Sequence, residues 1–202
     1  MTRNWNLKTK RHGRQDGFSL IEVMIAIVVM TVGLLAVIAS FATALAATQS
    51  AEEDLIARQK VLEAMESIYT ARNSQQIPFA SVANTASGGI FLAGPQPMLC
   101  PGPDGLVGTS DDVACTTVAG VNCPDGGAEC MVLPGPDGIL GTADDVTMSL
   151  GNFKRTIAIN PVLLPSGAPN PNMMAMTITV SYTKPGMPAR SFTASGLISS
   201  YH

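Results

Sequence analysis

The sequence predicts an α+β protein in which a long N-terminal helix packs on a C-terminal antiparallel β-sheet. One observation is an apolar run near the N-terminus that continues into a charged segment with helical spacing of its apolar residues. The other is a set of C-terminal segments in which β-branched residues alternate with polar ones, as in half-buried strands. The chain has 202 residues, of which 46% are hydrophobic, so it can form one folded head in addition to an anchor.

The first part of the chain has the features of a membrane anchor. Residues 1–17 are basic, and residues 23–47 contain no charge and no proline. That run exceeds the roughly 20 apolar residues that a helix needs to cross a bilayer, so residues 18–47 are expected to span a membrane once. Cations before such a run resist translocation, which predicts a cytoplasmic N-terminus and an outward-facing head. The cations are Arg3, Lys8, Lys10, Arg11 and Arg14.

An ordinary secretory signal is the main alternative for this segment. Ala44, Leu45 and Ala46 could form a small-residue cleavage site that releases a soluble protein. The apolar run is longer than the usual 7 to about 15 residues of a signal, and it carries a carboxylate, Glu22, near its beginning. Both features favour the membrane helix.

The helix is expected to continue through residues 48–73 as an amphipathic segment. Asp54 and Arg58 are expected to pair on its wet face, and Asn73, Ser74 and then Pro78 predict its end. An apolar stripe at helical spacing is expected to pack against the head. The stripe consists of Leu55, Val61, Leu62, Met65, Ile68 and Tyr69.

Residues 74–202 are expected to form the exported head. Segments 153–164, 173–183 and 190–200 predict strands, and residues 176–182 have the clearest period of two. Lys184, Pro185 and Gly186 predict a turn between the last two strands. A β-meander over residues 152–201 follows, with one face available to the long helix.

A duplicated acidic segment lies between helix and sheet, at residues 101–113 and 134–146. Each copy has an Asp-Gly turn and two further carboxylates on a glycine-rich loop, and calcium prefers such clustered oxygens. The candidate ligands are Asp104, Asp111, Asp112, Asp137, Asp144 and Asp145. The alternative is a pair of tight turns without metal, because these residue types favour turns and the EF-hand spacing is absent.

Four cysteines follow the apolar segment, and none forms a CxxC pair with metal-site spacing. Export to an oxidising compartment would permit two disulfides. Three connectivities are possible, of which pairing between neighbours is favoured. The cysteines are Cys100, Cys115, Cys123 and Cys130.

Two functional classes are not supported by the residues. The exported part has a single histidine, His202, and lacks a Gly-x-Ser-x-Gly elbow, an HExxH motif and a phosphate loop, so the chain is predicted not to be an enzyme. It also lacks a sustained basic patch and has few aromatic residues, so no nucleic-acid partner is expected.

The segment Gly17-Phe18-Ser19-Leu20-Ile21-Glu22-Val23 closely resembles the cleavage and methylation motif of type IV prepilins. The resemblance covers Gly17 to about Leu35 and implies a pilin-like fold. It also implies that a prepilin peptidase cuts between Gly17 and Phe18 and methylates the new amine of Phe18. Glu22 would then pair with that amine of a neighbouring subunit as the helices assemble.

The resemblance implies a structural subunit of a type IV pilus or a type II secretion filament. It would first span the inner membrane once, with a cytoplasmic N-terminus and a periplasmic head, and then enter a cell-surface pilus or a periplasmic filament. Its partners would be the prepilin peptidase, other pilin or pseudopilin subunits and the inner-membrane assembly platform. The spanning run lacks a helix-breaking proline and has only Gly33 as a weak point, which favours a minor pilin or a pseudopilin over a major pilin. A filament-tip adhesin and a secreted calcium-binding protein are the alternatives.

Overall fold

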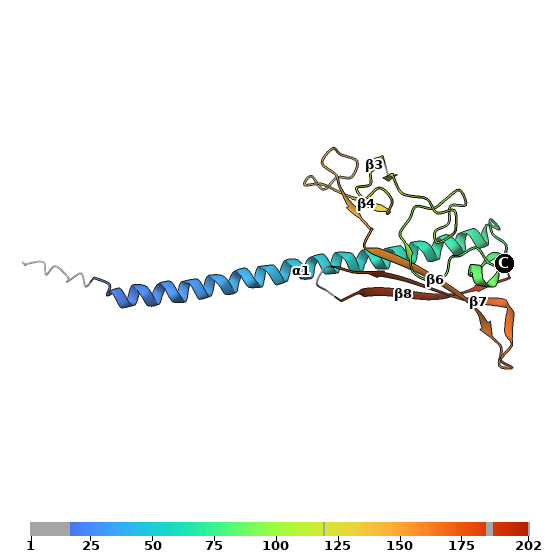
Figure 1. Cartoon of the computed structure of the whole chain (residues 1–202), viewed down its shortest axis with the longest axis horizontal. Coiled ribbons are helices and arrows are strands. Elements are labelled where there is room, and N and C mark those ends of the chain that lie inside the picture. The colour runs from blue at the N-terminus through green and yellow to red at the C-terminus, as the bar shows by residue number, and fades with distance from the viewer. Residues whose placement is uncertain (1–16, 119, 185–187, 202) are drawn as a thin grey trace, which may run out of the picture. The chain divides into compact units, whose positions relative to one another are not determined.

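The predicted α+β architecture is confirmed in the computed structural model, which describes residues 17–118, 120–184 and 188–201 (Figure 1). One compact unit ends at Thr48 and a second begins at Gln49. The basic residues of the predicted leader, residues Pro185 and Gly186 of the predicted turn, and His202 lie outside the described residues.

Helix α1 (Leu20–Asn73) contributes to both units and ends at the residue where the sequence predicted its end. In the first unit its large apolar side chains are exposed on every side, which is the pattern of a helix that spans a membrane. No proline or other breaker interrupts it, and the helix is continuous through Gly33. It is long and apolar enough to cross a bilayer.

The second unit contains a four-stranded antiparallel sheet with the order β1-β6-β7-β8. The strands are β1 (Gln96–Pro97), β6 (Phe153–Leu163), β7 (Pro169–Tyr182) and β8 (Arg190–Ser199). The three predicted strands are therefore present. Strand β7 begins at Pro169 rather than 173, because its first residues continue to pair with β6 after a register shift between Pro161 and Leu163.

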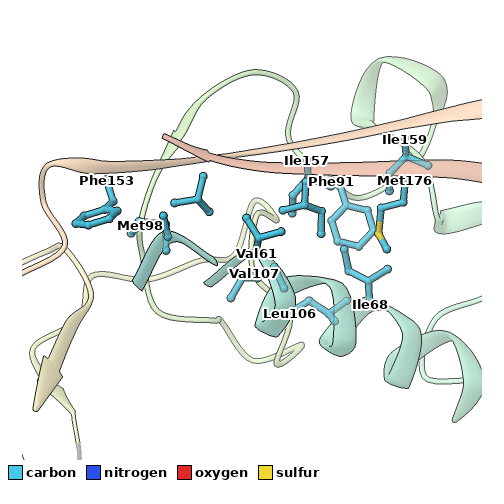
Figure 2. Packing of buried hydrophobic residues seen from close by; sticks show 14 of the residues in the cluster. Val61, Ile68, Phe91, Met98, Leu106, Val107, Phe153, Ile157, Ile159 and Met176 are labelled. Carbon is cyan, nitrogen blue, oxygen red and sulfur yellow. The ribbon is translucent and has the colours of Figure 1, made fainter. Parts of the chain in front are cut away.

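Helix α1 covers one face of this sheet. Alternate residues of β6 and β7, such as Ile157, Met176 and Ile178, are buried beneath it. Figure 2 shows Val61 and Ile68 of α1 pointing into this cluster. The helix face that packs here consists of Ile56, Ala57, Val61, Ala64, Ile68 and Ala71.

The predicted apolar stripe of α1 is only partly correct. Val61 and Ile68 are buried, whereas Leu55 and Leu62 are 65% and 49% exposed, so the prediction is wrong for these two leucines. Met65 and Tyr69 are half-buried at the edge of the core. The reason is steric. Three alanines spaced seven residues apart, Ala57, Ala64 and Ala71, lie on the packed face, and small side chains let a helix approach a sheet closely.

The predicted pair of Asp54 with Arg58 is also wrong. Asp54 Oδ2 lies 2.8 Å from Nη1 of Arg190 at the start of β8, and its Oδ1 accepts a hydrogen bond from the Tyr182 hydroxyl at 2.7 Å. Lys184 pairs with Glu53 at 3.6 Å. The acidic residues of this helix turn therefore hold the facing ends of β7 and β8.

The segment between helix and sheet contains short elements only. They are the 3-10 turns η1 (Phe79–Ser81) and η2 (Thr85–Ser87), and the antiparallel pairs β2 (Thr117–Val118) with β3 (Val121–Asn122) and β4 (Cys130–Leu133) with β5 (Val146–Ser149). Asn84 fixes this segment to the sheet. Its amide donates to the Ile157 carbonyl and accepts from the Ile159 N–H, each at 2.8 Å.

Substitution of two apolar residues of α1 tests which face is packed. Ile68→Ala removes a fully buried side chain and should lower the free energy of unfolding by about 2–5 kcal/mol. Leu62→Ala is the matched control and should cost less than about 1 kcal/mol, because Leu62 is half exposed. Denaturant unfolding of the detergent-solubilised chain measures both, and equal losses would contradict the observed helix orientation.

Candidate functional site

The N-terminal end of α1 is capped by Ser19. The backbone N–H of Glu22 donates to Ser19 Oγ at 3.3 Å and to the Ser19 carbonyl at 3.1 Å. Ser19 and Glu22 have the Ser-x-x-Glu spacing of a capping box, in which the serine satisfies a free N–H of the first turn. This role of Ser19 was missed by the sequence analysis, although the spacing itself is the signal. The carboxylate of Glu22 also lies where the helix dipole favours a negative charge.

Gly17 and Phe18 precede this cap and are not helical. Both are exposed, and the Phe18 side chain has 82% of its surface accessible. The Gly17–Phe18 peptide bond is therefore in an accessible, non-helical stretch of the kind that a protease cleft can bind. Of the three residues predicted for processing and assembly, Gly17 and Phe18 precede the helix and Glu22 lies in its first turn.

The two acidic repeats form similar loops that share three side-chain hydrogen bonds. In the first loop, Asp104 Oδ1 accepts from the Leu106 N–H at 2.8 Å, and Asp112 Oδ2 accepts from the Gly108 N–H at 2.7 Å. The Thr109 hydroxyl donates to Asp111 Oδ1 at 2.6 Å. In the second loop the equivalent residues repeat these three distances, with Asp137, Asp145 and Asp144 as the acceptors.

Glycine is required at three places in each loop, one of which is Gly108 or Gly141, with φ values of +80° and +89°. Gly105 and Gly138 have φ values of +69° and +71°, which side-chain-bearing residues rarely adopt. A Cβ atom on Gly102 or Gly135 would lie 2.1 or 2.2 Å from the carbonyl oxygen of Asp111 or Asp144, respectively. The repeat motif is thus explained by the conformation of the loop itself.

Each aspartate of both loops accepts a hydrogen bond from its own loop, whereas Asp145 Oδ1 has no partner. A hydrogen bond from Thr109 lowers the pKa of Asp111, and one from Thr142 lowers the pKa of Asp144. Within the part of the chain that the structure describes, no group of three or more histidine, cysteine or acidic side chains is arranged to hold a metal ion. Calcium binding by these aspartates therefore stays a prediction.

Two disulfides join neighbouring cysteines, Cys100 to Cys115 and Cys123 to Cys130. This is the connectivity that the sequence analysis favoured. Cys115, Cys123 and Cys130 are buried together with Val118 in a small second cluster. The cross-links stabilise this region, which has little regular structure, by lowering the entropy of its unfolded chain.

A cluster of buried charges lies where the first acidic loop, β6 and α1 meet. Lys60 of α1 is buried and pairs with Glu129 and, at 2.8 Å, with Glu63. Arg155 of β6 is 2% exposed, and its Nε and Nη2 atoms have no hydrogen-bond partner. Burial lowers the pKa of Arg155, which the nearby charges of Glu129, Asp112 and Glu63 oppose. The ion pair between Lys60 and Glu129 connects α1 to the segment that precedes β4.

Residues 12–38 match the family model described as the prokaryotic N-terminal methylation motif. This match supports a type IV pilin-like protein. It contains the accessible Gly17–Phe18 bond, the serine cap and Glu22 in one segment. No curated protein and no solved structure was found to match the chain.

Removal of one carboxylate tests the buried charge cluster. Glu129→Gln should lower the free energy of unfolding by about 3 kcal/mol or more, because Lys60 and Arg155 lose their shared buried counter-charge. Glu63→Gln is the control and should cost less than about 1 kcal/mol, because the Glu63 side chain is 50% exposed. Thermal unfolding of the full chain in detergent compares the two, and a larger loss for Glu63→Gln would contradict the assignment.

The same ion pairs have a predictable pH dependence. Burial alone would lower the pKa of Lys60, but the pairs with Glu129 and Glu63 outweigh it and raise the pKa above its ordinary value. The stabilisation is therefore fully present at neutral pH and is lost as the pH rises through the folded-state pKa. Glu129→Gln should remove most of this alkaline loss.

Proposed function

We propose that the chain is a structural subunit, a minor pilin or a pseudopilin, of a type IV pilus or type II secretion filament. The observation that supports this most is the accessible Gly17–Phe18 bond directly before a capped, uniformly apolar helix with one carboxylate in its first turn. A prepilin peptidase would cut after Gly17 and methylate Phe18. The trimmed helix would then be the part that assembles with other pilin or pseudopilin subunits on the inner-membrane assembly platform.

Glu22 would act as the alignment group of assembly. A carboxylate within an apolar helix is costly in a membrane and usually has a partner or a function. In the single chain this cost is reduced, because Glu22 lies in the first turn beside free backbone N–H groups. In the filament it would pair with the amine of Phe18 on a neighbouring subunit. Such a pair fixes the axial register of the helices even where its net stabilisation is small.

The orientation follows from charge and from cysteine chemistry. The basic residues 1–17 would stay in the cytoplasm, and the head with its two disulfides would fold in the oxidising periplasm. The continuous helix through Gly33 supports a minor pilin or pseudopilin, because the spanning segment contains no proline that would let the anchor extend. Pilin-type proteins are structural and generally non-enzymatic, which agrees with the residues of the head.

A filament-tip adhesin is the second candidate. The exposed second acidic loop and the disulfide-bonded segment would be its contact surface. Immunogold labelling of filaments with an antibody against the head separates the two. Labels restricted to filament ends indicate the adhesin, and labels at intervals along the shaft indicate a shaft subunit.

Processing is the first prediction to test. Expressed with its matching prepilin peptidase, the chain should yield a mature N-terminus at methylated Phe18, because Gly17–Phe18 is exposed and non-helical. Mass spectrometry of the mature chain measures this, and omission of the peptidase is the control. A mature N-terminus at Ala47 would instead show an ordinary secreted protein and would reject the proposal.

The assembly role of Glu22 has a separate test. Glu22→Ala should leave membrane insertion and cleavage intact and reduce the amount of chain in sheared filaments by about tenfold or more, because the Phe18 amine loses its partner. Ser19→Ala is the matched control. It removes the helix cap, at a cost of about 1 kcal/mol to the first turn, but keeps the carboxylate, so it should still be incorporated. Normal incorporation of Glu22→Ala would reject the role.

Calcium binding at the acidic loops is a separate proposal. It is supported by the carboxylate chemistry of the loops and by Asp145 Oδ1, which is buried without a hydrogen-bond partner. If calcium binds, an excess of about 100-fold over its Kd should stabilise the detergent-solubilised chain by about 2.7 kcal/mol, seen as a higher Tm than in a chelator. Asp145→Asn should weaken this shift, and magnesium is the control. An unchanged Tm would reject the proposal.

A further inference from the structure

Each acidic loop carries two neighbouring apolar residues at equivalent positions, which are buried in the first loop and exposed in the second. In the first loop, Leu106 and Val107 are 2% and 7% exposed and belong to the main core. In the second loop, the equivalent Ile139 and Leu140 are 60% and 61% exposed. Because the hydrogen bonds of the two loops agree, the second loop is already folded in the conformation in which the first loop packs.

The first loop shows what this conformation packs against. Leu106 and Val107 join Val61 and Ile68 of α1 in one apolar cluster, as Figure 2 shows. The loop backbone is held there by Gln76, whose amide donates to the Asp104 carbonyl at 2.5 Å. The apolar pair of the first loop therefore packs against residues of α1 and β6, and the polar side chain of Gln76 binds the loop backbone beside it. We expect the apolar pair of the second loop to fit a surface of the same kind.

A second surface that α1 and a strand form together is exposed on the head. It is a groove between α1 and β8, and we refer to it as the α1–β8 groove. Its apolar part is Leu55 of α1 and Phe192 of β8, and the guanidinium of Arg58 lies 5.7 Å from the Phe192 ring centre. Ala51, Asp54, Arg190 and Ser191 complete the lining.

The charges of the second loop and the groove are complementary. Asp137, Asp144 and Asp145 carry no ion pair among the described residues, and Arg58 likewise has no carboxylate within ion-pair distance there. Arg190 already pairs with Asp54, so Arg58 is the cation that could accept a carboxylate from outside. In such a contact, the apolar pair would meet the Leu55 and Phe192 part of the groove, and the loop carboxylates would lie near the Arg58 guanidinium.

We propose that the second acidic loop of one copy docks Ile139 and Leu140 into the α1–β8 groove of a second copy. The two surfaces are different parts of the chain, the β4–β5 connection and the α1–β8 groove, so a heterologous arrangement is open to them, in which a copy presents its loop to one neighbour and its groove receives the loop of another. Heterologous contacts that do not close into a ring generate an open filament. The inference rests on the proposed filament function and adds a contact between heads to the contact between helices.

Photo-crosslinking of the full chain in its membrane tests this contact. Benzoylphenylalanine in place of Ala143, an exposed residue of the second loop, leaves Ile139 and Leu140 intact. We expect a crosslinked dimer whose peptides join residue 143 to residues 51–62 or 190–192. The same probe in place of Ser166, an exposed residue of the β6–β7 connection, is the control and should give no such product.

Two variants test which residues make the contact. With the probe at residue 143, the double change Ile139→Ser and Leu140→Ser should lower the crosslink yield by about tenfold or more. A factor of ten corresponds to about 1.4 kcal/mol, and burial of two such side chains contributes more than this. Arg58→Glu in the groove should lower it as well. Absence of the dimer, a crosslink elsewhere, or no effect of either variant would overturn the contact.

The outcome is separable from that of the proposed function. If the contact fails alone, the chain is still cleaved to Phe18 and still recovered in filaments, but without the crosslink. If the proposed function fails, the N-terminus is not at Phe18, whatever the crosslink yield.

Discussion

The close packing of α1 on β6 and β7 is the contact on which the rest of the head depends. Ala57, Ala64 and Ala71 let the helix approach the sheet, and the larger Val61 and Ile68 fill the space between them. This choice of face determines what remains outside. Leu55 and Arg58 are left at the surface beside β8, and the buried side receives the first acidic loop. If α1 were rotated about its axis, different residues would be buried against the sheet and exposed beside β8.

The duplicated loop shows how one local conformation can serve two purposes. Its aspartates accept hydrogen bonds from backbone N–H groups of the loop itself, which stabilises the same local conformation in both copies. The first copy then contributes Leu106 to the core, and the second copy leaves Leu140 outside. Duplication of a self-capped loop thus supplies an apolar contact that can be used within the chain or between chains.

The N-terminal segment combines local order with chemical accessibility. Ser19 ends the helix with a hydrogen bond, which leaves Gly17 and Phe18 outside the helix. The same cap holds Glu22 in the first turn, where the dipole stabilises its charge in the single chain. The helix beyond it offers no packed face within its own unit, so its apolar surface must be covered by lipid or by other helices.

The sequence by itself determined the features that depend on near neighbours in the chain. The extent of α1, the three long strands and the processing motif each follow from a local period or a short pattern. Ser19 was equally readable from its spacing to Glu22. The tertiary structure alone decided that Leu62 is exposed and Ala64 buried, because hydropathy ranks leucine above alanine whereas the sheet selects by shape. It also decided which acidic loop is buried. The sequences of the two loops are too similar to show that the first packs in the core and the second remains at the surface.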